Sequence, residues 1–149
     1  MQNMCMNATT QTDQRDPKLV YGFSSEYITA PGATQVGVVW AISAEKGTTL
    51  WKHEQRTGVM SLVATGGGLV FGGDVAGDFK AYDEATGAVL WETNLGSPVS
   101  GYPVTFAVDG KQYVAVTTGQ SLVASAARRV TPELTGESGG AQVFVFALP

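Results

Sequence analysis

The chain has 149 residues, 44% hydrophobic and 15% charged, a composition typical of a globular protein long enough to bury a core. The net charge is −4 and the nine basic residues are scattered, so the chain has no basic surface that would bind nucleic acid. With one cysteine and one histidine, the sequence predicts neither an internal disulfide nor a zinc site. No apolar stretch approaches about 20 residues, so no membrane span is expected, and the start lacks the basic and apolar regions of a signal peptide.

Nineteen glycines separate many short runs rich in Val, Phe and Tyr, which predicts an all-β chain with tight turns. Helical periodicity is nearly absent. In chain order, residues 2–6 look like the stump of an inner strand. Residues 9–34 are polar and carry Pro17, Pro31 and Gly32, which predicts a long surface loop.

The chain then repeats itself at an offset of 40 residues, because Gly37–Trp51 aligns without a gap on Gly77–Trp91. Each copy has the pattern of a hairpin, with strands expected at 36–43 and 48–53 in the first copy and a glycine turn between them. The closing tryptophan should be buried against the neighbouring hairpin. The identities fall at Gly37/Gly77, Ala41/Ala81, Gly47/Gly87, Leu50/Leu90 and Trp51/Trp91.

Forty residues is the size of a four-stranded propeller blade. Residues 66–68 form a glycine turn between two expected strands, and Asp109–Gly110 is a hairpin signal between two later ones. Residues 121–140 are expected to form a second long surface loop. The second copy predicts strands at 61–65, 69–72, 77–83 and 89–93, and a further blade has strands at 102–107, 112–117 and 142–148.

These strands make a partial β-propeller of about 2.5 four-stranded blades, whereas a closed ring needs about four to eight. The remaining blades would come from another chain, from self-association, or from sequence before Met1. Open apolar strand edges invite pairing, so the isolated chain is expected to be poorly soluble or oligomeric.

In their order and spacing, several segments resemble the quinoprotein alcohol dehydrogenases of the methanol/ethanol type. The resemblance implies an eight-bladed W-motif propeller, of which residues 1–149 supply the C-terminal blades, and which uses pyrroloquinoline quinone (PQQ) with calcium or a lanthanide. The segments that carry it are Asn3–Met6, Ala64–Asp74, Ala81–Asp83, Thr86–Gly87, Leu90–Glu92, Gly110–Val116 and Val145–Leu148.

The resemblance also implies an activity, a partner and a compartment. The family oxidises a primary or secondary alcohol to an aldehyde or ketone by hydride transfer to PQQ, with the metal as Lewis acid, and passes electrons to a cytochrome c in the periplasm. Its metal ligands, its catalytic Asp, the tryptophan beneath PQQ and its adjacent-cysteine disulfide belong to blades upstream of this sequence. The chain alone is therefore expected to be inactive.

This sequence could supply part of the PQQ rim, the set of residues that borders the bound quinone. The family's Asn contact falls on Asn3 or Gln2. Two positions that are often tryptophan in the family align with Val59 and Val123, and Leu122 beside the latter is assigned to the same rim. The valines at these two positions remove aromatic surface from the edge of the quinone. Cys5 matches the family's strand cysteine, whose partner would lie in the upstream portion.

Other motifs have structural explanations. The segment Gly119–Val123 begins like a nucleophile elbow but lacks the closing glycine, and Asp74–Asp78 lacks the oxygen ligands of an EF-hand and predicts a β-turn. No pair of carboxylates points to acid/base chemistry. The alternative function is a non-catalytic propeller scaffold or binding module, as in outer-membrane assembly lipoproteins, and the missing rim tryptophans favour it.

Overall fold

The computed structural model describes residues 2–13, 22–134 and 139–148. Strands dominate these ranges, as the glycine and β-branched content predicts, and there is one α-helix with a short 3₁₀-helix after it. The elements are β1 (Gln2–Met4), β2 (Met6–Asp13), β3 (Gly22–Thr29), β4 (Gly37–Ile42), β5 (Thr49–Gln55), β6 (Val59–Ala64), β7 (Leu69–Asp74), β8 (Asp78–Asp83), β9 (Val89–Asn94), β10 (Val104–Val108), β11 (Lys111–Thr117), α1 (Leu122–Val130), η1 (Pro132–Leu134) and β12 (Val143–Ala147).

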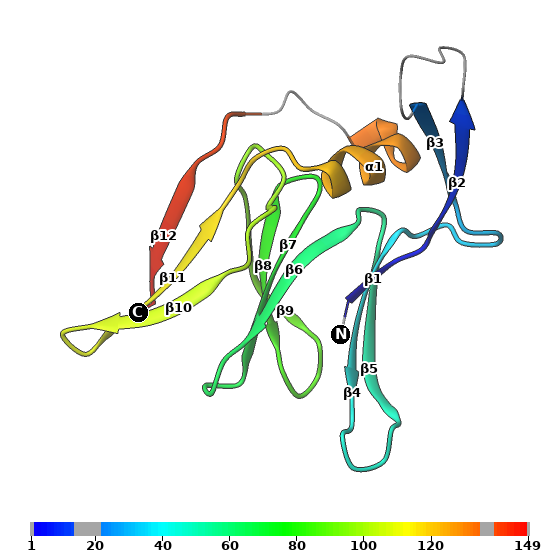
Figure 1. Ribbon diagram of the computed structural model, residues 1–149. Coiled ribbons are helices and arrows are strands. Elements are labelled where there is room, and N and C mark those ends of the chain that lie inside the picture. The colour runs from blue at the N-terminus through cyan, green and yellow to red at the C-terminus, as the bar shows by residue number, and fades with distance from the viewer. Residues whose placement is uncertain (1, 14–21, 135–138, 149) are drawn as a thin grey trace.

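Three antiparallel sheets stand side by side as the blades of an open arc (Figure 1). The first blade has the order β1-β4-β5, the second β6-β7-β8-β9 and the third β10-β11-β12. Every strand predicted from the repeat is present, with ends shifted by at most a few residues. The partial β-propeller is therefore confirmed as the fold, with one complete and two three-stranded blades among the described residues.

The hairpin turns follow the predicted glycine chemistry. Asp109 and Gly110 both have positive φ, 50° and 78°, as a two-residue hairpin turn with the right-handed strand twist requires. Gly47 and Gly87 occupy the same left-handed position in the two repeat copies, with φ of 64° and 75°.

Two segments expected as surface loops contain regular structure. Within 9–34 the chain forms most of the β2–β3 hairpin, with Met6 opposite Thr29 and Thr10 opposite Ser25. Polarity suggested a loop there, but the threonines and Tyr27 favour strands, and a two-stranded arm can be polar on both faces. Residues 14–21 lie outside the described part. The expected single strand 2–6 is divided at Cys5, where β1 ends and β2 begins.

The second expected insertion, 121–140, contains α1. Ser121 is its N-cap, and the Ser121 hydroxyl accepts a hydrogen bond from the Ala124 amide at 3.0 Å. The buried face consists of Ala124, Ala126, Ala127 and Val130, so the helix is amphipathic, but it is only nine residues long. The expectation of an all-β chain is confirmed, since the described residues contain only this α-helix and η1 besides strands, although the helix itself was not anticipated within 121–140. Residues 135–138 are not described.

An aromatic ladder joins the second and third blades. Phe79 is fully buried in β8, and its ring centroid lies 5.9 Å from Phe71, 5.9 Å from Phe146 and 6.0 Å from Trp91. Because Phe146 comes from β12, the ladder crosses from one blade to the next. Val114 and Val116 complete this core from the third blade.

The repeated tryptophans contact the next blade, as predicted, but they are not fully buried. The Trp51 indole donates a hydrogen bond to the Glu84 carbonyl at 2.7 Å, and Trp91 packs edge-on against Phe146 at 5.3 Å. Trp91 remains 40% exposed. Both rings come from the outermost strand of a blade, where one side of the ring meets solvent.

Substituting Gly87 by alanine should weaken the joint between the first two blades. A Cβ there would lie 2.6 Å from Trp51 Cδ2, at a φ of 75°. We expect the free energy of unfolding to fall by about 2–4 kcal/mol, measured by urea denaturation followed by tryptophan fluorescence.

The matched control is Gly47→Ala, because Gly47 has a φ of 64° but open space around its Cβ. This variant should lower the free energy of unfolding only by the backbone strain of alanine at positive φ, about 1–2 kcal/mol. Equal losses for the two variants would contradict packing of Trp51 on the second blade.

Candidate functional site

Three elements that carry the sequence-predicted rim residues meet at Gly58. A Cβ at Gly58 would lie 2.7 Å from the Met4 sulfur and 3.4 Å from the Ala127 Cβ. Met4 ends β1, Gly58 immediately precedes β6, and Ala127 lies in α1. A side chain at position 58 would touch Ala127 and displace the Met4 side chain, so the end of β1, the start of β6 and the helix pack closely at this glycine.

The structure places each predicted rim residue on one of these elements. Gln2 and Asn3 lie in β1, where their backbones pair with Val39 and Val38. Val59 begins β6 and is 2% exposed, so its side chain presents no free surface. Leu122 and Val123 form the first turn of α1 and are 91% and 45% exposed.

Val123 and Ala127 are four residues apart and share a face of α1. The Ala127 side of this face contacts Gly58, so Val123 lies one helical turn away from the meeting point. Leu122 is turned to solvent. The structure thus brings β1, Val59 and the Val123 face of α1 to one end of the blades.

A buried carboxylate holds the linker between β5 and β6. Asp74 ends β7 and is 2% exposed, and its Oδ2 accepts hydrogen bonds from Thr57 Oγ1 at 2.8 Å and Gln55 Nε2 at 3.0 Å. Its Oδ1 accepts from the amides of Ala76 and Asp78 at 2.9 and 3.0 Å. The second pair of bonds confirms the predicted β-turn.

The first pair of bonds is a feature that the sequence interpretation missed. Lys80 adds a cation 3.8 Å from Asp74 Oδ2. Burial raises the pKa of the Asp74 carboxyl above its ordinary value, while the hydrogen bond from Thr57 and the charge of Lys80 oppose that rise. Since a buried carboxylate is costly without partners, these donors are needed to hold it there.

His53 is the only histidine of the sequence, and its ring lies edge-on to Tyr82 with a centroid distance of 5.3 Å. Burial lowers its pKa, and Lys80 lowers it further, against a smaller opposing effect of Glu92. The folded state therefore binds this proton less readily than the unfolded state. Stability is full above the ordinary pKa of about 6.5 and falls as the pH drops through it.

We expect the free energy of unfolding to decline between about pH 7.5 and 5.5, a window in which histidine is the main titrating side chain. His53→Phe keeps a ring beside Tyr82 but cannot titrate, so its stability should be nearly flat over this range. Urea titrations at four pH values measure both slopes. A slope that persists in the variant would exclude His53 as the cause.

The remaining sequence motifs have structural roles here. Ser121 caps α1 with its hydroxyl, which explains the elbow-like start of Gly119–Val123. Within residues 2–13, 22–134 and 139–148, no group of three or more His, Cys, Asp or Glu side chains is arranged to hold a metal ion. In the same ranges, no helix is long and apolar enough to cross a membrane.

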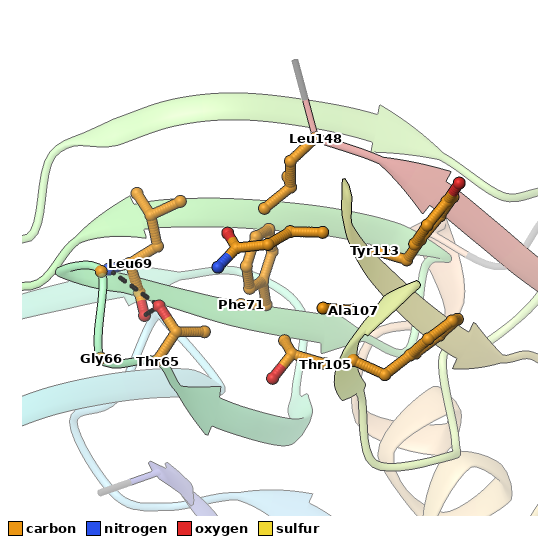
Figure 2. A pocket seen from close by; sticks show the side chains of 11 residues that line it. Thr65, Gly66, Leu69, Phe71, Thr105, Ala107, Tyr113 and Leu148 are labelled. Atoms are coloured by element: carbon orange, nitrogen blue, oxygen red, sulfur yellow. Dashed lines mark hydrogen bonds between the residues drawn. The ribbon is translucent and has the colours of Figure 1, made fainter. Parts of the chain in front are cut away.

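A pocket of about 460 Å³ opens between the second and third blades at the end of β6 opposite to Val59 (Figure 2). Phe71 and Leu148 supply apolar surface, and Thr65 and Thr105 supply hydroxyl groups. Its lining contains no carboxylate, histidine, lysine or cysteine, so it offers no group for acid/base or nucleophilic chemistry near neutral pH. It is separate from the rim.

Blades of this repeat, with a glycine-turn hairpin closed by a tryptophan, define the class of propeller proteins with W-type repeats. The family model for the β-propeller domain of PQQ-dependent glucose/ethanol/alcohol dehydrogenases matches residues 34–114. The chain belongs to this family.

Relatives agree with this assignment. The quinoprotein alcohol dehydrogenase PedE of Pseudomonas putida is 39% identical over 85 residues, which are 56% of this chain and 14% of that protein. The lanthanide-dependent methanol dehydrogenase of Methylacidiphilum fumariolicum is 46% identical over 85 residues, again 56% and 14%. The 1-butanol dehydrogenase (quinone) of Thauera butanivorans is 35% identical over 115 residues, 76% of this chain and 18% of that protein.

The fold is also found in a solved europium-containing methanol dehydrogenase, with a TM-score of 0.76 and 32% sequence identity. This likeness covers 99% of our chain and 30% of that chain. The chain thus spans less than a fifth of the length of the curated relatives described above and about a third of the solved one.

Proposed function

We propose that this chain forms C-terminal blades of a PQQ-dependent alcohol dehydrogenase and borders the quinone with the residues around Gly58. The observation that carries the proposal is the meeting of β1, β6 and α1 at that glycine, in a chain of this family. The substrate class is a primary or secondary alcohol, which is oxidised to an aldehyde or ketone.

The described residues fit the edge of PQQ but not its metal. The exposed side chains of Leu122 and Val123 offer apolar surface on α1, and glutamine and asparagine at positions 2 and 3 are residue types whose amides can bond the polar edge of a quinone. No metal-ligand cluster is found in the described part of the chain, so calcium or a lanthanide would be held by other blades.

When bound, PQQ supplies the hydride acceptor for alcohol oxidation. The role of this chain is to orient PQQ and to enclose one side of it. The amide of Asn3 or Gln2 would fix the polar edge of the ring system, and the Val123 face of α1 would exclude water from that side. Val59, buried behind them, would keep the wall in place.

The first partner is therefore the rest of the propeller. The outer face of the third blade carries large apolar side chains that no described residue covers, among them Val104 and Val145, which are 58% and 55% exposed. The inner face of the same sheet packs on the second blade. A neighbouring blade is the occupant that this repeated geometry fits, and a cytochrome c in the periplasm is the proposed electron acceptor.

Complementation tests the proposal. The europium-containing methanol dehydrogenase, deleted of the 30% that this chain matches, is co-expressed with our chain and supplied with PQQ and a lanthanide. Dye-linked methanol oxidation is expected from the pair and from neither part alone. Our chain alone, titrated with PQQ and calcium, should not oxidise ethanol.

The relative's own deleted segment, supplied in trans, is the positive control. Activity with that segment, together with an assembled but inactive complex containing our chain, would favour the second candidate, a non-catalytic propeller scaffold. The observation that favours this alternative is the presence of valine at positions 59 and 123, which gives the rim no aromatic surface.

A further inference from the structure

The Asp74 carboxylate divides its hydrogen bonds between two structures. Its Oδ1 serves the β7–β8 turn through the Ala76 and Asp78 amides, and its Oδ2 serves the β5–β6 linker through Thr57 and Gln55. The turn alone would need only the first pair. The second pair joins the first blade to the second.

The linker bonds form a closed network. Gln55 Nε2 also donates to the Thr57 hydroxyl at 3.0 Å and to the Thr57 carbonyl at 3.2 Å, and Lys80 Nζ donates to Gln55 Oε1 at 3.3 Å. Thr57 is 7% exposed. Thr57 and Asp74 are buried, so water cannot easily replace a lost donor, and without the Thr57 hydroxyl Asp74 Oδ2 keeps only the bond from Gln55 Nε2 and the Lys80 ammonium at 3.8 Å.

Thr57 is followed by Gly58, the point where β1 and α1 meet. The Val75 amide donates to the Gly58 carbonyl at 3.0 Å, and Val59 pairs with Asp74 in the ladder. The segment next to Asp74 therefore holds the linker from both sides of Gly58. A shift of the linker would move the Met4 end of β1 and the Ala127 face of α1, which both touch Gly58.

We propose that Asp74 is a positioning residue for the rim: through Thr57 it fixes Gly58, and through Gly58 the spacing of β1, β6 and α1. Asp74 itself lies under the linker and need not touch a ligand. This inference rests on the proposed function, since the spacing matters for catalysis only if these blades border PQQ.

Thr57→Val isolates this role, because it removes the hydroxyl donor, keeps nearly the same shape and leaves the β7–β8 turn untouched. Thr57→Ser restores the donor. The control is Thr86→Val, which removes a hydroxyl that donates to Asp83 Oδ1 at 2.7 Å, in a turn of the same blade remote from Gly58. Thr57→Val also removes the acceptor of the Gln55 Nε2 bond at 3.0 Å, and Thr86→Val removes the acceptor of the Ala88 amide bond at 3.3 Å, so each valine variant loses one hydroxyl–carboxylate bond and one accepted bond.

The first readout is amide hydrogen exchange of the full chain by mass spectrometry. Thr57→Val should raise exchange of residues 55–60 by about tenfold or more, with Thr57→Ser close to the unsubstituted chain. Thr86→Val should instead raise exchange of residues 83–88. An unchanged linker in Thr57→Val would overturn the inference, whether or not PQQ binds.

The second readout is PQQ affinity of the complemented assembly. Thr57→Val should raise the apparent Kd about tenfold, while Thr57→Ser and Thr86→Val stay within about twofold. Equal losses for Thr57→Val and Thr86→Val would show a general stability effect and overturn positioning. No PQQ binding by the unsubstituted assembly would overturn the proposed function, and the exchange result would then decide the role of Asp74 in holding the linker.

Discussion

Phe79→Ala should destabilise the chain more than any other single truncation of a described side chain. Its ring is fully buried and touches Phe71, Trp91 and Phe146, so removing it opens a cavity in both the second blade and the joint to the third. We expect a loss of about 3–5 kcal/mol, out of a total of about 5–15 kcal/mol for a domain.

Urea denaturation, followed by tryptophan fluorescence and by far-ultraviolet circular dichroism, measures this loss as a shift of the midpoint. Phe106→Ala is the control, since Phe106 is 41% exposed and stacks only on Tyr113 among the rings of the described residues. It should cost less than about 1 kcal/mol. Similar losses would contradict the ladder as the joint of the two blades.

A second large effect is expected at the outer face of the third blade. Val104 and Val145 both lie opposite Ala115 in neighbouring strand pairs, so they sit on one face of the sheet. The double variant Val104→Glu, Val145→Glu places two like charges on this face. The blade itself should still fold, because both positions are more than half exposed.

Sedimentation velocity should show the unsubstituted chain as oligomers and the double variant as a monomer, with association weakened by about a hundredfold or more. Complementation of the deleted methanol dehydrogenase should be lost as well. Ile28→Glu, a charge on the 50% exposed Ile28 of the β2–β3 arm, should change neither. A monodisperse monomer without any substitution would contradict the open-face argument.

The blades could be predicted from the sequence because their signals are local. The repeated glycines Gly47 and Gly87 mark a position that needs positive φ, and Asp109–Gly110 specifies a hairpin turn whatever surrounds it. The tryptophan contact followed from the repeat itself, since a residue that recurs once per blade tends to meet the next blade. The partial exposure of the tryptophan rings could not be predicted in this way, because burial depends on all the residues that pack around a ring.

The two insertions were mispredicted for a common reason. Residues 7–10 of β2 are exposed and polar or small, so they create no alternating pattern, and α1 spans nine residues, fewer than the window of about 11–18 over which a helical period is recognised. The helix instead contacts the other strand of the arm, β3: Arg129 of α1 donates to the Ser25 carbonyl at 2.9 Å and lies over the Tyr27 ring. Such contacts link positions about a hundred residues apart.

The candidate site shows the same limit. The resemblance to the family supplied Asn3, Val59 and Val123, and these remain proposals about ligand contact. Asp74 was correctly interpreted as a turn residue, but nothing near it in the sequence indicates Thr57 and Gln55 as its partners. The exposed fraction of Leu122 and the burial of Val59 likewise depend on packing between blades.

The two joints of the arc differ in kind, which predicts an order of events when the molecule opens. Residues of the main buried cluster come from the second and third blades and the segment between them, so these two blades should melt and exchange their amides as one cooperative unit. The first blade is attached through Trp51, the edge-on contact of His53 with Tyr82 and the polar network at Asp74. Under force or in mild denaturant the first blade should detach and unfold first, leaving a two-blade intermediate that still contains the aromatic ladder.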